Sequence, residues 1–278
     1  MTLHTAKLGA KLDPIGKRLL ETIVSVALLI LVSPVLVVVA LIVWRSSPGP
    51  LFYRQKRVGR DGKIFDIMKF RTMCVGADQY GPSVTSCDDS RITPVGRFLR
   101  NSKLDELPQL FNVVNGTMSL VGPRPQVPRF VDHFEPEKRD VVLSVRPGVT
   151  GLTALCFRNE ERLLSNISDR ETYYIERILP VKLELDAWYV QHRSLAKDLY
   201  IFSATAILLL VPPVRRRLAP HRPVREEEMA GKIMRRYLGF VAPKPANTGV
   251  VQAVHPSLWY SFNDDRFRLA GLTILPND

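Results

Sequence analysis

The chain has 278 residues, of which 46% are hydrophobic and 24% are charged, and its net charge is +12 at pH 7. This composition is globular and excludes a disordered or collagen-like chain. The basic excess predicts a polyanionic partner, for which nucleic acid, an anionic membrane and phosphorylated small molecules all qualify. Three cysteines without a CxxC pair argue against a disulfide framework or a zinc site and fit reduced thiols in the cytosol.

The first predicted element is a hydrophobic run over residues 23–44 that carries no charged side chain. At about 1.5 Å per residue, a straight helix of this length just spans the hydrocarbon core of a bilayer. Pro34 lies in the middle of the run, where it removes a backbone donor and clashes with the carbonyl of Ile30. The Ser33 hydroxyl can bond a carbonyl one turn back, so we predict a sharp bend at Ser33–Pro34.

Basic residues flank this run on both sides, and positive flanks favour the cytoplasmic side of a membrane. A re-entrant helix that enters, bends at Ser33–Pro34 and returns keeps both clusters on that side. A transmembrane helix with a proline kink is the alternative, and it separates them. We therefore predict a basic N-terminal arm over residues 1–18 and a re-entrant membrane helix, broken at Ser33–Pro34, over residues 19–44. The flanking cations are Lys7, Lys11, Lys17, Arg18, Arg45, Arg54, Lys56, Arg57 and Arg60.

Residues 45–214 are predicted to form one compact cytosolic domain of the α/β class, rich in helix. A tight turn at Asp61–Gly62 leads into a predicted strand on which Lys69 and Arg71 stand two residues apart. Residues at this spacing share one face of a strand. The pair fits either a solvated basic edge or a phosphate site.

Residues 93–114 show helical periodicity, which Pro108 breaks or bends. Asp105 and Glu106 stand side by side in this segment. Adjacent side chains on a helix project about 100° apart, so two acids can share a site without having the same role. One could attack a substrate while the other holds a cation. The alternative is a pair of surface acids that balance neighbouring Arg and Lys residues through helical contacts.

Arg124 is held between Pro123 and Pro125, each of which fixes its own φ and restrains the preceding residue. An arginine fixed in this way is suited to binding an anion. The chain has no GxxxxGK[ST] or GxGxxG motif, so nucleotide binding through these motifs is not indicated. It also has no GxSxG motif of the kind that carries a nucleophilic serine. Positioned arginines, an acid pair and a membrane anchor together suit transfer of a phosphate-containing group to or from a lipid.

A second apolar run, over residues 199–214, is short for a membrane crossing and ends at a Pro-Pro pair. We predict an interfacial helix there, with a core helix as the alternative. Residues 215–278 begin with a basic cluster and contain scattered prolines. We predict a basic C-terminal extension whose role the sequence does not indicate.

Four blocks of the sequence match the pattern of one known family. They are KRLLETIVSVALLILVSPVL, GPLFYRQKRVGRDGKIFDIMKFRTM, DDSRITPVGRFLRNSKLDELPQLFNVVNGTMSLVGPRP and RPGVTGLTAL, and the similarity covers about residues 15–212. With these blocks the chain resembles the bacterial sugar transferases that are monotopic phosphoglycosyl transferases. The resemblance implies transfer of a sugar 1-phosphate from a UDP-sugar to undecaprenyl phosphate, with release of UMP. That reaction initiates a surface glycan such as exopolysaccharide, capsule or O-antigen.

The resemblance also implies a location and a set of functional residues. The domain is expected on the cytoplasmic leaflet of the bacterial inner membrane, with the family's catalytic acid pair at Asp105 and Glu106 and with Mg²⁺ as cofactor. Asp105 would attack the sugar-linked phosphate to form a phosphosugar–aspartate, and Glu106 would hold Mg²⁺. The implied substrate-binding residues are Lys69, Arg71, Arg100, Pro123, Arg124, Pro125 and Arg158. Phe157 and Thr117 depart from the family pattern, which often has Gly and an acid at these positions.

Two other classes of function compete with this enzyme. A membrane-tethered binding protein would explain the basic charge but not the acid pair or the Pro-Arg-Pro block. An assembly factor of a polysaccharide machine would keep the fold without the activity, and the intact acid pair argues against it. We expect no nucleic-acid partner, because aromatic residues interleaved with Lys and Arg are not evident. The donor sugar, the final glycan and a homo-oligomeric state stay open.

Overall fold

The computed structural model describes residues 14–210 except 83, 159 and 166, together with two short strands near the C-terminus. The helices are α1 (Pro14–Ser46), α2 (Pro94–Ser102), α3 (Gln109–Val114), α4 (Pro128–Val131), α5 (Pro136–Leu143), α6 (Leu152–Cys156), α7 (Glu160–Leu163), α8 (Arg170–Tyr173), α9 (Leu179–His192) and α10 (Leu195–Leu210). The strands are β1 (Phe52–Val58), β2 (Ile64–Phe70), β3 (Ser119–Val121), β4 (Gly148–Thr150), β5 (Phe267–Leu269) and β6 (Leu272–Ile274).

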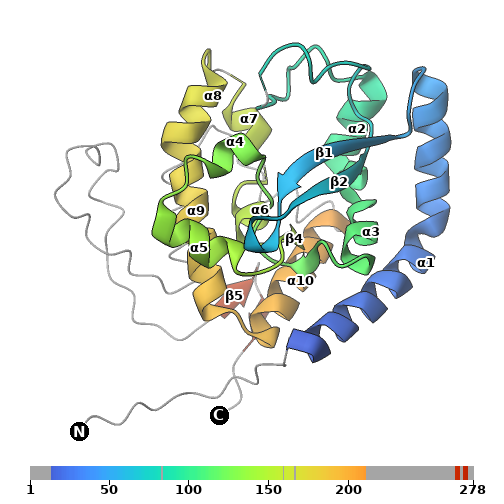
Figure 1. The fold of residues 1–278 in the computed structure, drawn as a ribbon. Coiled ribbons are helices and arrows are strands. Elements are labelled where there is room, and N and C mark those ends of the chain that lie inside the picture. The colour runs from blue at the N-terminus through green and yellow to red at the C-terminus, as the bar shows by residue number, and fades with distance from the viewer. Residues whose placement is uncertain are drawn as a thin grey trace, which may run out of the picture. The chain divides into compact units, whose positions relative to one another are not determined.

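The described residues fall into two units, of which the first ends at Leu210 and the second contains β5 and β6, an antiparallel pair. In the first unit, helices surround two small sheets (Figure 1): β1 pairs with β2 antiparallel, and β3 pairs with β4 in parallel. The helix-rich α/β class predicted from the sequence is confirmed. The extension predicted over 215–278 and most of the basic arm predicted over 1–18 lie outside the described residues.

Helix α1 is long and apolar enough to cross a membrane. Its ribbon changes direction partway along (Figure 1), and Pro34 lies inside it. The Ser33 hydroxyl donates a hydrogen bond of 2.8 Å to the Ile30 carbonyl, as the sequence predicts. The backbone stays helical through Ser33 and Pro34, so the predicted break is a bend within one helix. A proline is an ordinary cause of such a bend, because it removes one bond of the helical ladder.

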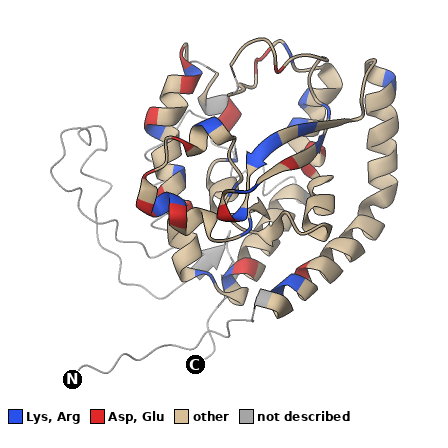
Figure 2. Cartoon of the chain, in the orientation of Figure 1, with Lys and Arg blue, Asp and Glu red and all other residues tan. Residues whose placement is uncertain are grey.

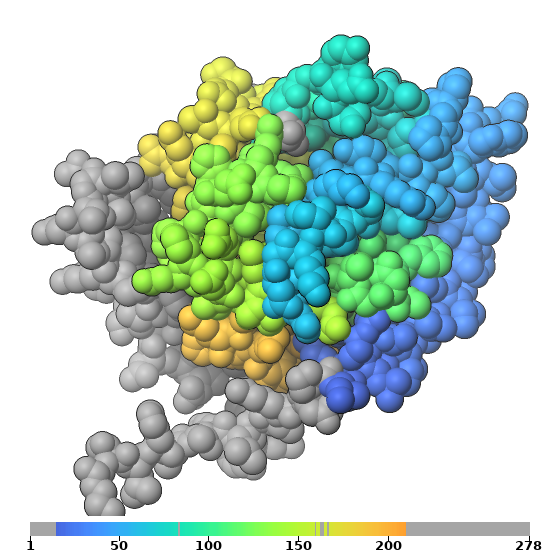
Figure 3. Space-filling view, in the orientation of Figure 1, coloured from blue at the N-terminus to red at the C-terminus, as the bar shows by residue number. Residues whose placement is uncertain are grey.

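Most apolar side chains of α1 are exposed, including Ile30 and Leu31 at 70% and 74%. Figure 2 shows the middle of the helix without Lys, Arg, Asp or Glu, and Figure 3 shows α1 running along one side of the folded body. Both ends are nevertheless fastened to that body. Arg18 donates to the carbonyls of Val113 and Val114 at one end, and Val43 packs with Phe70 and Leu99 at the other.

The segment over 93–114, whose periodicity predicts a helix broken or bent at Pro108, forms three elements. Helix α2 begins at a Thr93 cap, whose hydroxyl accepts from the Gly96 amide, and it ends at Lys103, where φ is +61°. A 3₁₀ turn over Leu104–Glu106 follows, and α3 begins only after Pro108. The predicted break at Pro108 is therefore present, but the left-handed residue at Lys103 adds an earlier one.

Tight backbone packing and one buried amide fix this segment against β2. A methyl group added at Gly96 would lie 1.9 Å from the Thr72 carbonyl oxygen, so only glycine allows α2 to approach so closely. The Asn112 amide of α3 donates to the Asp66 carbonyl at 2.8 Å and accepts from the Met68 amide at 3.0 Å. These contacts hold the 3₁₀ turn beside the end of β2.

The helix predicted near residues 199–214 is present as α10, which begins four residues earlier, at Leu195, and is described as far as Leu210. The tight turn predicted at Asp61–Gly62 is also present, and Asp61 adopts φ +57° there. Leu199, Ile207 and Leu209 are exposed on α10.

Candidate active site

The 3₁₀ turn places Asp105 and Glu106 in different surroundings. Successive residues of a 3₁₀ helix project about 120° apart, so neighbouring side chains face different groups. Asp105 is buried at 6% exposure, and Glu106 turns toward β2 and the segment after β3. The two side chains face different groups, as the sequence predicts, although the turn is tighter than the α-helix expected.

Glu106 is the centre of a half-buried ionic cluster. Its Oε1 accepts from Lys69 Nζ at 2.7 Å and from Arg124 Nη2 at 2.7 Å, and its Oε2 lies 3.4 Å from Arg124 Nη1. Burial opposes ionisation of this carboxyl, but the charges of Arg124 and Lys69 outweigh it and hold the pKa of Glu106 well below its ordinary value. Glu106 is therefore a permanent anion that fixes two cations.

Asp105 has the opposite character. Its Oδ1 is buried and has no hydrogen-bond partner among the described residues. Burial, and then the charge of Glu106, raise the pKa of Asp105 to about 6. A carboxylate whose lone pairs are neither solvated nor bonded is a better nucleophile than one held by donors, and at neutral pH most of it is ionised.

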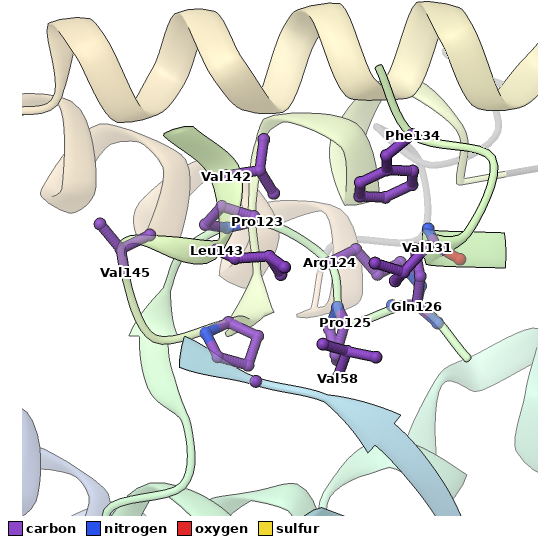
Figure 4. A pocket seen from close by; sticks show the side chains of 12 residues that line it. Val58, Pro123, Arg124, Pro125, Gln126, Val131, Phe134, Val142, Leu143 and Val145 are labelled. Atoms are coloured by element: carbon purple, nitrogen blue, oxygen red, sulfur yellow. The ribbon is translucent and has the colours of Figure 1, made fainter. Parts of the chain in front are cut away.

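Arg124 projects from a segment that is held at every residue. The Gly148 amide donates to the Pro123 carbonyl at 2.8 Å, and Arg57 Nη1 donates to the Pro125 carbonyl at 3.0 Å. Behind the segment lies an apolar cavity of about 10 Å³, whose lining includes Phe134 and the three residues of the Pro-Arg-Pro block (Figure 4). A cavity of this size holds one water at most, so it is a packing defect and no substrate pocket.

The structure brings together four of the predicted site residues: Asp105, Glu106, Lys69 and Arg124. Three others bind elsewhere. Arg71 donates to the carbonyls of Ser47 and Pro48, Arg100 pairs with Glu161, and Arg158 donates to the Leu208 carbonyl.

The predicted pairing of Lys69 and Arg71 on one face is wrong, because β2 ends at Phe70 and Arg71 turns back toward the end of α1. Arg100 still acts on the site at a distance, since its charge is among those that lower the pKa of Asp105 against the effect of burial.

Three residues that the sequence analysis did not select share the face of Lys69. Tyr53 is paired directly with Lys69 across the sheet, and Gln55 and Arg57 follow at alternate positions of β1. They are half-buried, whereas the residues that alternate with them, Phe52, Arg54 and Lys56, are exposed. This alternation in FYRQKR is the signal that could have found them.

The residues present fit a divalent cation that keeps most of its own waters. No group of three or more His, Cys, Asp or Glu side chains gathers anywhere in the described part of the chain. Glu106 Oε2 accepts a long bond of 3.4 Å from Arg124 Nη1 and keeps a lone pair for a cation. Mg²⁺ is usually bound by one or two carboxylates together with substrate phosphates and waters, so this one carboxylate oxygen is a sufficient protein contribution.

Comparison with known proteins now identifies the family. The model of the bacterial sugar transferase family matches residues 12–211. The chain belongs to this family.

Its relatives include a protein of Aeromonas hydrophila named UDP-N-acetylgalactosamine-undecaprenyl-phosphate N-acetylgalactosaminephosphotransferase, which is 35% identical over 75% of this chain and 48% of its own. Proteins named UDP-glucose:undecaprenyl-phosphate glucose-1-phosphate transferase are 38% identical in Klebsiella pneumoniae and 37% identical in Caulobacter vibrioides. Both matches cover 70% of this chain, but they cover 40% of the first protein and 69% of the second. The chain therefore spans less than half the length of the Aeromonas and Klebsiella proteins.

Proposed function

We propose that this protein transfers a sugar 1-phosphate from a UDP-sugar to undecaprenyl phosphate and releases UMP. The observation that carries the proposal is the buried, unpartnered Asp105 carboxylate oxygen beside the Lys69–Glu106–Arg124 cluster. The activities for which the relatives are named support the same reaction, and the donor sugars in those names differ. We further propose that the lipid-linked product initiates a surface glycan.

In the first half-reaction, an Asp105 oxygen attacks the phosphorus that carries the sugar. The new aspartyl O–P bond forms as the bond from this phosphorus to the bridging oxygen breaks, and UMP leaves with that oxygen. Lys69 and Arg124 donate to phosphate oxygens, because a guanidinium and an ammonium are effective partners for a diphosphate. Glu106 keeps both cations in place before the donor arrives.

In the second half-reaction, an oxygen of undecaprenyl phosphate attacks the same phosphorus. The aspartyl O–P bond breaks, Asp105 returns to a carboxylate, and the product is a lipid-linked diphosphosugar. No proton has to be moved at either step, so neither step requires a general acid or base. Mg²⁺, held by Glu106, would offset the negative charge that accumulates between carboxylate and diphosphate.

We propose that α1 is re-entrant and that the body lies on the cytoplasmic leaflet of the inner membrane. Arg18 near one end of α1 and Val43 near the other contact the same folded body, which supports a position of both ends on the same side of the membrane as that body. A straight crossing would place one end on the far side. The exposed apolar residues on the middle of α1 are the part that enters the lipid.

The reaction is tested by UMP release with undecaprenyl phosphate and a panel of UDP-glucose, UDP-galactose and UDP-N-acetylgalactosamine. We expect the native protein to release UMP from at least one donor and Asp105→Asn to release none. Asp140→Asn is the matched control, because Asp140 is 77% exposed. Normal turnover by Asp105→Asn would disprove the assignment of the nucleophile.

The topology is tested separately, with single cysteines at the exposed positions Ile15 and Lys63 in a chain whose native cysteines are replaced by serine. An impermeant maleimide added to intact cells should label neither position, and both should be labelled after permeabilisation. Labelling of one position in intact cells would show that α1 crosses the membrane.

A further inference from the structure

Arg57 lies on the face of β1 that looks into the candidate active site. Register pairs Tyr53 with Lys69 and Arg57 with Phe65, and opposite residues of an antiparallel pair project to the same face. The Arg57 guanidinium is close enough to Glu106 and Arg124 for their charges to act on its pKa. Three cations thus approach one region: Lys69 from β2, Arg57 from β1 and Arg124 from the loop after β3.

The hydrogen bonds of Arg57 leave part of its guanidinium without a partner. Nη2 donates to Gln55 Oε1 at 2.6 Å, and Nη1 donates to the Pro125 carbonyl at 3.0 Å. Nε is buried and has no partner among the described residues. A guanidinium has five N–H groups, so these contacts fix its plane and leave donors available.

The charge of Arg57 is also not neutralised. Every ion pair found among the described residues that involves this site joins Glu106 to Lys69 or Arg124, and none includes Arg57. Burial, and then the repulsion of Arg124, lower the pKa of Arg57 to about 10, which still leaves it charged at neutral pH. A half-buried cation whose Nε is fully buried, and which has no anion beside it, is unfavourable for folding, so such a group points to an anionic ligand.

Counting charges gives the same conclusion. Arg57, Lys69 and Arg124 supply three cations, and Glu106 and Asp105 supply two acids, so the cluster keeps a net charge of +1 with both acids ionised. The donor diphosphate carries a negative charge on each phosphate. Its arrival would give Arg57 the anionic partner that the protein does not provide.

We propose that Arg57 binds the donor directly, as a third phosphate-contacting residue beside Lys69 and Arg124. This inference rests on the proposed function and names the group of the substrate that Arg57 recognises, the diphosphate. A purely structural role is the competing explanation, because the bond to the Pro125 carbonyl also holds the segment that carries Arg124. The two explanations predict different effects of replacing Arg57 on the thermal stability of the protein without ligand.

The test compares Arg57→Gln and Arg57→Lys with Arg54→Gln, whose position on the exposed face of the same strand makes it a matched control. The dissociation constants of UDP and inorganic pyrophosphate are measured by calorimetry on the full chain in detergent with Mg²⁺, at a temperature where every variant is folded. We expect Arg57→Gln to weaken both ligands by roughly ten- to a hundredfold, the range for loss of a charge-assisted hydrogen bond. The affinities of Arg57→Lys should lie between those of Arg57→Gln and of the native chain. The affinities of Arg54→Gln should equal those of the native chain.

The melting temperature without ligand completes the test. If Arg57 is an unneutralised, half-buried charge, the melting temperature of Arg57→Gln should be unchanged or higher, whereas loss of a purely structural contact should lower it. Unchanged affinity would overturn the inference, and so would an affinity loss that appears only together with a lower melting temperature. Failure of the native chain to release UMP would instead count against the proposed function, because binding of UDP is measured independently of turnover.

Discussion

Removal of the charge should change the stability of the folded protein in opposite directions for the two adjacent acids of the site. Asp105→Asn is the more informative variant. Burial and Glu106 raise the pKa of Asp105 from 3.8 to about 6. One pKa unit corresponds to about 1.4 kcal/mol, so ionised Asp105 destabilises the folded state by about 3 kcal/mol at neutral pH. Asparagine keeps the shape and removes the charge, so the variant should lose activity and gain up to about this amount of stability.

The stability difference between Asp105→Asn and the native chain should depend on pH in a defined direction. Because the pKa of Asp105 is higher in the folded than in the unfolded chain, the folded chain binds more protons between about pH 4 and pH 6. The destabilisation is therefore absent below pH 4, grows as the pH rises, and is complete above the folded pKa. The difference in melting temperature between Asp105→Asn and the native chain should be near zero at pH 4 and roughly 5 °C at pH 7.5.

Thermal unfolding followed by intrinsic fluorescence in detergent measures this difference, and Asp140→Asn serves as the control because its exposed charge should change nothing. The reasoning is refuted if Asp105→Asn melts below the native chain at pH 7.5. It is equally refuted if the difference between the two chains does not change with pH. Either result would mean that Asp105 has a partner in the folded protein.

Three further outcomes follow from the same geometry. Glu106→Gln should lower the free energy of unfolding at pH 7 by about 3–5 kcal/mol, measured in denaturant, because it leaves Lys69 and Arg124 without their anion. The rate of UMP release at low donor concentration should fall as the pH drops below about 6, where Asp105 becomes protonated. Arg91→Gln should speed proteolytic cleavage of the segment between residues 77 and 91, because Arg91 donates to the carbonyls of Ala77, Tyr80 and Pro82.

Each outcome has a result that would contradict it. A Glu106→Gln chain as stable as the native one would mean that solvent already compensates the two cations. A rate that stays level down to pH 5 would exclude Asp105 as the ionised group that reacts. Equal proteolysis of Arg91→Gln and of an Arg97→Gln control, which changes an exposed arginine of α2, would show that Arg91 does not order the segment.

Features that depend only on residues close together along the chain could be predicted from the sequence. The Ser33 hydroxyl bonds the carbonyl of Ile30, and the turn at Asp61–Gly62 joins two strands, as expected. The interruption at Lys103 was missed because a lysine in a left-handed conformation has no sequence signature, and the apolar periodicity continues past it. The left-handed residue is a consequence of α2 and the following turn packing against β2.

The sequence predicted only in part which distant residues meet at the candidate active site. Lys69 and Arg124 meet at Glu106 because β2 and the segment after β3 lie on either side of the 3₁₀ turn, which no spacing in the sequence reveals. Arg100 was grouped with the acid pair by proximity in sequence, but its guanidinium turns to Glu161. Arg57 was counted as one of the basic residues that flank the membrane segment, because its strand alternation becomes meaningful only once the paired strand is known.

The central proposal is that Asp105 becomes covalently attached to the sugar phosphate between the two half-reactions. The most direct test incubates the protein with a UDP-sugar that it turns over but without lipid acceptor, quenches in acid, and examines the peptides by mass spectrometry. We predict one added sugar phosphate on the peptide that contains Asp105, which disappears when undecaprenyl phosphate is supplied before the quench. Active protein in which that peptide never gains this mass would contradict the proposal.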